Sequence, residues 1–180
     1  MRAQRIAAAV AAAAALAGCS ADVAPGAAAR DGDGEVVVTV AEVDALSAEL
    51  SEAFPDTADV DRVVVFFSVI ADEVRDSARE SGALVSADEV RRGVAEQTEV
   101  QLSDEAAEVV AVSTMFSQLA QGPDGAALVE RISALEPVLN PRYGTWDPGR
   151  WAPGENLPIA DETLPWLAET EPGAEEEPAG

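Results

Sequence analysis

The sequence of 180 residues contains no histidine and no lysine, and all 11 of its basic residues are arginine. Without histidine the chain lacks the commonest general base and the commonest transition-metal ligand. Without lysine it cannot supply the phosphate-binding Lys of a P-loop or the amine of a Schiff base. A single cysteine excludes internal disulfides and zinc sites built from several Cys. These absences disfavour most classes of enzyme, and we expect no catalytic residue, no metal and no cofactor.

Positive charge is scarce throughout the chain, which carries 34 acidic residues against 11 basic ones and a formal net charge of −23. Such a chain repels DNA, RNA and anionic lipid headgroups, so the sequence predicts no nucleic-acid partner. Aromatic residues are also few, at 4%, whereas apolar residues make up 48%. A core can therefore form, and we expect it to be mainly aliphatic. The length suits one ordinary domain.

Neighbouring acidic residues occur several times and raise the question of carboxylate chemistry or calcium binding. Adjacent carboxylates on a helix point in different directions, so such pairs do not converge on one ion. The run Asp31-Gly32-Asp33-Gly34 comes closest to a calcium loop but lacks its trailing Glu. We interpret the acids as a solvated face. The pairs are Asp72 with Glu73, Asp88 with Glu89 and Asp104 with Glu105, and a further acidic run covers residues 175–177.

The N-terminus has the organisation of an export signal. Arg2 and Arg5 precede a run of twelve apolar residues, 6–17. The run is too short for a membrane-spanning helix, which needs about 20 residues, and fits the apolar region of a signal peptide. It leads into Leu16-Ala17-Gly18-Cys19, which resembles the lipobox of bacterial lipoproteins. The resemblance implies cleavage between Gly18 and Cys19 and acylation of Cys19 by groups such as palmitate. The alternative is an ordinary signal peptide with a chance cysteine, but the only Cys of the chain stands at the end of this run.

Composition divides the chain into four segments. Residues 1–18 form the predicted lipoprotein signal peptide. Residues 19–34, which are small and rich in Ala and Gly, are interpreted as the lipidated cysteine and a flexible tether. Residues 35–167 form the predicted folded domain, with a Pro- and Trp-rich extension at its C-terminal end. Residues 168–180 carry five Glu and two Pro with no large apolar residue, so we expect an acidic, disordered tail, which could also serve as an interaction element.

Hydrophobic periodicity predicts a mainly α-helical domain. Residues 35–40 are largely β-branched and predict a short strand, and Val138-Leu139 predicts a second one. Between them, apolar residues recur at three- and four-residue steps, as in amphipathic helices. The expected fold is an irregular bundle of about five helices closed by two short β-strands. The helices are expected at 40–54, at 62–81, from 85 onward, from 103 onward and at about 124–135. Capping boxes are predicted at Thr39 with Glu42 and at Ser86 with Glu89, and a cap at Ser103.

The stretch 62–81 is the most apolar part of this domain. Its first half could be a buried strand on periodicity alone. Its second half favours a single helix, because Ile70, Val74 and Ala78 step by four and Gly82 is a C-terminal stop. A helix that is apolar nearly all round belongs at the centre of a bundle, so we expect this run to be core.

The segment Asn140-Pro141-Arg142-Tyr143-Gly144-Thr145-Trp146-Asp147 resembles the end of the chaperone-like module of SurA/PrsA-type foldases, in the form found among Gram-positive lipoproteins with a SurA N-terminal domain. In these proteins a strand ending in Asn-Pro-Arg-Tyr-Gly closes the module. It is preceded by an apolar strand leading into an amphipathic helix, a long apolar helix and a short helix, in the order seen here at 36–50, 62–81 and 85–90. The resemblance covers about residues 35–147 and implies a SurA N-terminal domain-like fold.

The isomerases of this family also carry a parvulin domain, with catalytic His residues, before the closing strand. This chain has no His, and only a few residues separate its last predicted helix from Asn140. The resemblance therefore implies the holding function without peptidyl-prolyl isomerase activity. We expect a lipoprotein, anchored through Cys19 at the extracytoplasmic face of the cell membrane, that binds unfolded or secreted client proteins. The alternative is a structural or interaction lipoprotein that binds one fixed partner of the cell envelope.

Two roles are open for the residues of this motif. In a structural corner, Tyr143 and Trp146 would pack on the bundle and Arg142 would pair with a nearby carboxylate such as Asp147. This reading is favoured over direct contact with clients. The apolar segment 146–167 that follows either completes the core or, in our hypothesis, forms a lid over a groove that clients enter. The candidate residues are Asn140, Pro141, Arg142, Tyr143, Gly144 and Trp146.

Overall fold

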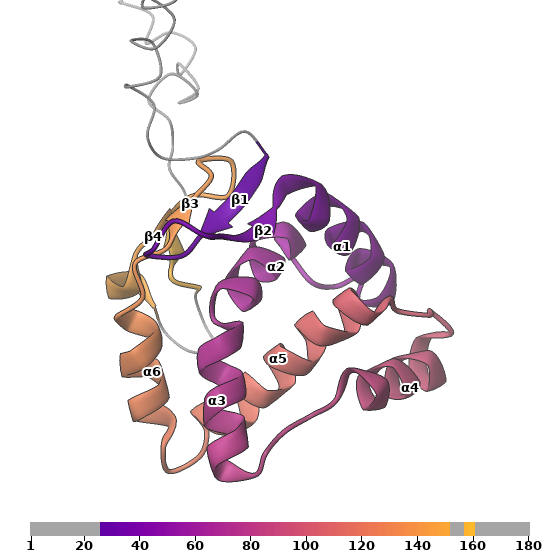
Figure 1. Cartoon of the computed structure of the whole chain (residues 1–180). Coiled ribbons are helices and arrows are strands. Elements are labelled where there is room, and N and C mark those ends of the chain that lie inside the picture. The colour runs from indigo at the N-terminus through magenta and orange to yellow at the C-terminus, as the bar shows by residue number, and fades with distance from the viewer. Residues whose placement is uncertain (1–25, 152–156, 161–180) are drawn as a thin grey trace, which may run out of the picture.

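The computed structural model describes residues 26–151 and 157–160, and it confirms a mainly helical domain with a small antiparallel sheet (Figure 1). The predicted signal peptide, Cys19 and the acidic tail lie outside the described residues. The elements are β1 Ala27–Arg30, β2 Val36–Thr39, α1 Val40–Ala53, α2 Val60–Val69, α3 Ala71–Ser81, α4 Ala87–Thr98, α5 Asp104–Ala120, α6 Gly125–Ser133, β3 Val138–Leu139, β4 Thr145–Trp146, the 3₁₀-helix Pro148–Arg150 and β5 Ile159–Ala160.

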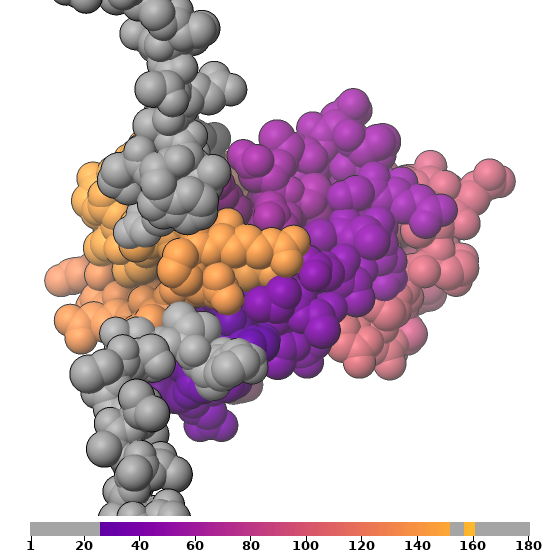
Figure 2. Space-filling view, turned by 90° about the horizontal axis from the view of Figure 1, so that it is seen from above, coloured from indigo at the N-terminus to yellow at the C-terminus, as the bar shows by residue number. Residues whose placement is uncertain are grey.

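A three-stranded antiparallel sheet in the order β2-β1-β3 brings the two ends of the domain together. Ala29 of β1 pairs with Val38 on one side and with Leu139 on the other. β4 and β5 form a separate antiparallel pair, with Thr145 opposite Ala160. Figure 2 shows the orange surface of the segment after α6 lying against the indigo surface of the N-terminal elements. The N- and C-terminal parts of the domain therefore depend on each other.

The middle strand β1 corrects the predicted boundary of the tether. Residues 20–34 were expected to be flexible because they are small and lack large apolar side chains. In the structure, Ala27, Ala28 and Ala29 are no more than 2% exposed and lie at the centre of the sheet. Their small side chains let the backbone approach α1 and α2 closely, and the strand is held by ladder hydrogen bonds on both edges rather than by large apolar groups. The prediction is wrong for residues 27–30.

The junction of β2 with α1 is the predicted capping box. The Thr39 hydroxyl accepts a hydrogen bond from the Glu42 backbone N–H at 3.3 Å, and the Glu42 carboxylate accepts one from the Thr39 backbone N–H at 2.8 Å. The Thr39 hydroxyl also donates to the Glu42 carboxylate at 2.7 Å. This bond, and after it the bond from the Thr39 backbone N–H, lowers the pKa of Glu42, because both favour its charged form. The predicted cap at Ser103 is confirmed, since its side chain accepts from the Ala106 N–H. At Ser86 the predicted box is half formed: the Ser86 side chain accepts from the Glu89 N–H, without the return bond that Glu42 makes to Thr39.

The single helix predicted over 62–81 is two helices, because the chain turns at Ile70. This residue has φ −91° and ψ 0°, outside the α-helical range, and its side chain is fully buried. The turn lets α2 pack on α1 and the sheet while α3 packs on α5 and α6. Sequence periodicity continues through the turn, so it predicts one helix where tertiary packing produces two.

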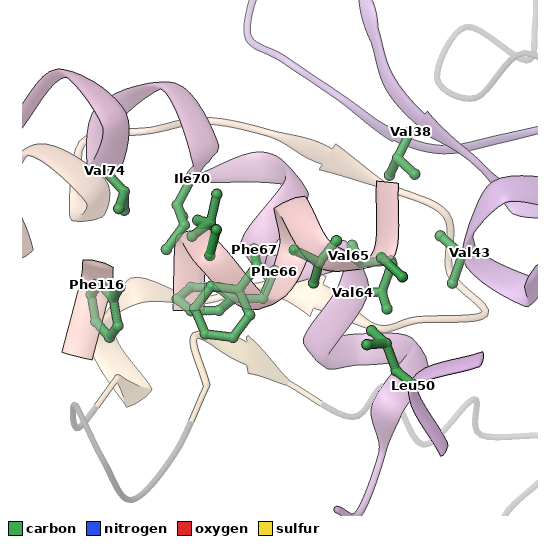
Figure 3. Packing of buried hydrophobic residues seen from close by; sticks show 14 of the residues in the cluster. Val38, Val43, Leu50, Val64, Val65, Phe66, Phe67, Ile70, Val74 and Phe116 are labelled. Atoms are coloured by element: carbon green, nitrogen blue, oxygen red, sulfur yellow. The ribbon is translucent and has the colours of Figure 1, made fainter. Parts of the chain in front are cut away.

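One hydrophobic core joins the helices to the sheet, and α2 supplies its centre (Figure 3). Val64, Val65 and Phe66 of this helix are at most 1% exposed. Val43 and Leu50 of α1 approach them from one side, and Ile70 and Phe116 lie at the other end of the labelled cluster. The expectation that this run is core is confirmed. None of the helices within the described ranges is both long and apolar enough to cross a membrane.

Candidate functional site

Asn140 fastens the predicted motif to the start of the domain. Its backbone N–H donates to the Ala28 carbonyl at 2.8 Å, and its side-chain amide donates to the Ala27 carbonyl at 3.2 Å. Its own side-chain oxygen accepts from the Arg142 N–H at 3.1 Å, and its carbonyl accepts from the Tyr143 N–H at 2.9 Å. Asn140 thus continues the sheet and stabilises the turn that follows, as expected for a residue with a structural role at a corner of the fold.

Arg142 projects from this turn to α1. Its guanidinium lies 2.9 Å from a carboxylate oxygen of Asp44, and it also lies over the Tyr143 ring, 5.5 Å from the ring centre. The prediction that Arg142 pairs with Asp147 is wrong. The Asp147 carboxylate accepts instead from the Gly149 N–H at 3.0 Å, at the start of the 3₁₀-helix. Both members of the Arg142–Asp44 pair are about half exposed, so solvent screens their attraction and the pair contributes little to stability.

Tyr143 and Trp146 pack on the bundle as the structural reading predicts. Tyr143 is fully buried, and burial raises the pKa of its hydroxyl, against the opposing effect of the Arg142 cation. Trp146 stacks on Phe66 at 6.2 Å between ring centres. The Tyr143 ring offers no free surface to a client, and the Trp146 ring is only partly exposed. The motif therefore closes the fold, and its exposed residues Pro141, Arg142 and Thr145 are left for direct client contact.

The described part of the extension after Trp146 completes the core rather than covering a groove. Trp151 stacks on Phe116 at 5.9 Å and meets Phe66 edge-on at 6.1 Å. Pro158 is fully buried, and Ile159 is 8% exposed. The lid hypothesis is therefore wrong for residues 146–151 and 157–160, while Leu164 and Leu167 lie outside the described residues. The few aromatic side chains also gather here, which composition alone did not indicate.

An open groove of about 1210 Å³ lies on another face, and the sequence analysis missed it. In Figure 1 the helices α1, α3 and α4 lie around the diagonal helix α5, and these elements line the groove together with β2 and the end of α2. Each contributes only two to five lining residues. No sequence pattern marks such a site, because its walls come from segments far apart in the chain.

The groove has an apolar lining along its base. Leu46 of α1, Phe67 of α2 and Val109 and Val112 of α5 contribute side chains to it. Val36 and Val37 of the edge strand β2 also line it, and they remain 41% and 38% exposed. Exposed valines beside an open apolar base provide a surface on which the apolar side chains of another molecule can be buried.

Polar contacts tie the walls of the groove to α5. From α1, Glu49 accepts hydrogen bonds from the backbone N–H and the hydroxyl of Ser103, the cap of α5. From α3, Arg75 donates to Glu108 at 2.8 Å. From α4, Arg91 pairs with Asp104. The three contacts hold α1, α3 and α4 at set positions around the groove.

The rim of the groove is strongly acidic. Its lining includes two arginines, and both are paired with carboxylates: Arg75 with Asp72 and Glu108, and Arg91 with Asp88 and Asp104. Asp88 and Asp104 raise the pKa of Arg91, chiefly through the hydrogen bond that Arg91 donates to the Asp88 carboxylate. With nine carboxylates the lining carries a formal charge of −7. The acidic residues are Asp31, Glu35, Glu42, Glu49, Asp72, Asp88, Asp104, Glu105 and Glu108.

The rim brings many carboxylates near one another. Within residues 26–151 and 157–160, no three acidic side chains converge closely enough to hold an ion. The chain matches no protein-family model, no curated protein and no solved structure.

Proposed function

We propose that the chain is a membrane-anchored extracytoplasmic lipoprotein with chaperone-like binding of unfolded or extended client proteins, and that its domain is SurA N-terminal domain-like. The groove between α1, α3, α4 and α5 carries this proposal. Its volume of about 1210 Å³ exceeds the usual 300–1,000 Å³ of small-molecule pockets, which favours a polypeptide occupant. Its apolar base suits the side chains that an unfolded chain exposes.

The proposed anchor is Cys19, which follows Leu16-Ala17-Gly18. Cys19→Ser should move the protein from the membrane to the soluble fraction or leave the signal peptide uncleaved, because no thiol remains to accept the lipid. Ser20→Ala, which changes the next residue and keeps the lipobox, should behave as wild type. Fractionation together with mass spectrometry of the N-terminal peptide measures both. A Cys19→Ser protein with the location and mobility of wild type would contradict the anchor.

Chaperone-like activity should appear as suppressed aggregation of several unrelated denatured proteins by the full-length protein in non-ionic detergent. Leu46→Gln places an amide in the base of the groove and should weaken this suppression severalfold, because a buried amide without a partner is unfavourable. Ala48→Gln, on the exposed side of α1 and outside the groove lining, is the matched control. Light scattering measures aggregation, and circular dichroism checks that both variants are folded.

Failure to suppress the aggregation of any denatured protein would contradict the proposal. Stoichiometric capture of one folded envelope protein, with no effect on denatured ones, would instead establish the fixed-partner lipoprotein. Equal activity of Leu46→Gln and Ala48→Gln would place client binding outside the groove.

A further inference from the structure

The acidic rim has more negative charge than the groove needs for its own structure. Glu49, Asp104 and Glu108 hold the walls through Ser103, Arg91 and Arg75, as described above. The carboxylates of Glu35 and Glu105 take part in no hydrogen bond or ion pair in the part of the chain that the structure describes. Both are exposed residues of the groove lining: Glu35 immediately precedes β2, and Glu105 lies in the first turn of α5.

The positive groups of the groove are already engaged. Arg75 contacts two carboxylates, and Arg91 contacts two others. An acidic segment entering the groove would therefore meet like charge at the rim and no unpaired cation among the lining residues, which is an unfavourable arrangement. A segment bearing Arg or Lys would meet the opposite charge at every wall.

Arginine and lysine also fit the apolar base. Their aliphatic stems can lie along apolar surface while the charged ends reach water or a carboxylate. Arginine can also bond a carboxylate through two N–H groups. The juxtaposition of the apolar base at Leu46 and Val109 with a rim of formal charge −7 therefore matches a polypeptide with apolar side chains next to basic ones.

We infer that the groove selects cationic polypeptide segments in which Arg or Lys residues flank apolar side chains, with Glu35 and Glu105 as specificity-determining residues. This inference rests on the proposed function and names the class of client. The apolar base supplies affinity for any unfolded segment, and the rim discriminates by charge. Negative charge at the rim also speeds the approach of basic segments at low ionic strength.

Three fluorescent peptides with the same Leu and Val residues test the inference. Arg flanks these residues in the first peptide, and Gln or Glu replaces every Arg in the other two. Fluorescence anisotropy, with the full-length protein in non-ionic detergent, measures the dissociation constant of each peptide. The Arg peptide should bind most tightly, the Gln peptide less tightly and the Glu peptide least, with at least a tenfold difference in dissociation constant between the Arg and Glu peptides. This difference should disappear in 1 M salt, where the screening length falls to about 3 Å.

The double substitution Glu35→Gln and Glu105→Gln should weaken binding of the Arg peptide about three- to tenfold and leave the Gln peptide unchanged. Glu130→Gln with Glu136→Gln is the matched control, since these exposed carboxylates lie outside the groove lining and their loss changes the net charge equally. If the two double substitutions weakened binding of the Arg peptide equally, the assignment of Glu35 and Glu105 as specificity-determining residues would be overturned.

Equal binding of the three peptides would overturn the charge preference and leave the chaperone proposal standing if Leu46→Gln weakens all of them. Failure of the aggregation assay, with tight binding of the Arg peptide, would instead overturn the chaperone proposal and leave a site for one basic partner. The photo-crosslinked product of an Arg peptide should map to residues 42–49 and 105–112, and products confined to α6 would contradict the groove.

Discussion

Replacing Ile70 by Asp is expected to abolish folding of the domain. The side chain is fully buried where α2 turns into α3, in contact with the core that joins the helices to the sheet. Removing a buried isoleucine side chain costs about 2–5 kcal/mol. A buried carboxylate without a partner adds about 3–5 kcal/mol. The sum reaches the whole stability of a typical domain, about 5–15 kcal/mol, so circular dichroism should show loss of helix and of the cooperative thermal transition.

Leu84→Asp is the matched control for this substitution. It introduces the same carboxylate at a large apolar residue, but Leu84 is 56% exposed in the connection between α3 and α4. Surface substitutions usually change stability by no more than about 0.5 kcal/mol. The two variants should therefore differ sharply. A cooperative Ile70→Asp protein that melts near the wild-type temperature would show that this turn is not part of the core.

The local elements that the sequence predicted correctly are those determined by neighbouring residues. The capping box at Thr39 and Glu42 needs only a three-residue spacing, and the caps at Ser86 and Ser103 work in the same way. The strand at 36–39 is likewise local. The SurA-like family assignment stays a prediction, since the arrangement of helices and sheet supports only the coarser description of a mainly helical domain.

The features that sequence reasoning missed depend on distant parts of the chain. β1 is a strand because β2 and β3 supply hydrogen-bond partners on both sides, and three alanines carry no local strand signal. The turn at Ile70 follows from the different packing partners of α2 and α3. Additional short strands form at 145–146 and 159–160 through a pairing across the intervening segment.

At the candidate site, too, sequence reasoning succeeded for local features and failed for contacts between distant segments. The sequence located the motif at 140–146 and favoured its structural role, but it could not place Asp44, 98 residues away, beside Arg142. The groove was invisible to sequence reasoning because each wall contributes few lining residues. Some of its acids were noted as members of adjacent pairs and Asp31 as part of a calcium-like run, but none as part of one site. Asp88 and Asp104, interpreted as members of separate pairs, in fact share Arg91.

Gly144→Ala should destabilise the domain by about 2–4 kcal/mol, because two separate constraints act at this position. Gly144 has φ +106°, which L side chains rarely adopt. A Cβ there would also overlap the carbonyl oxygen of Ala160 and lie 3.1 Å from Cγ2 of Ile159. The overlap is with backbone, so relief would require β5 to move away from β4, which would disturb the packing of Trp146 on Phe66.

Substitutions at two other glycines test the backbone strain and the steric overlap separately. Gly34→Ala introduces only the backbone strain, since Gly34 has φ +84° and a Cβ there would meet nothing within 4 Å. Gly93→Ala, in the interior of α4, has neither constraint and should stabilise the protein by up to about 1 kcal/mol. Urea unfolding followed by tryptophan fluorescence should therefore rank stability as Gly93→Ala, wild type, Gly34→Ala and Gly144→Ala. A Gly144→Ala protein as stable as Gly34→Ala would mean that β4 and β5 do not close against each other at this point.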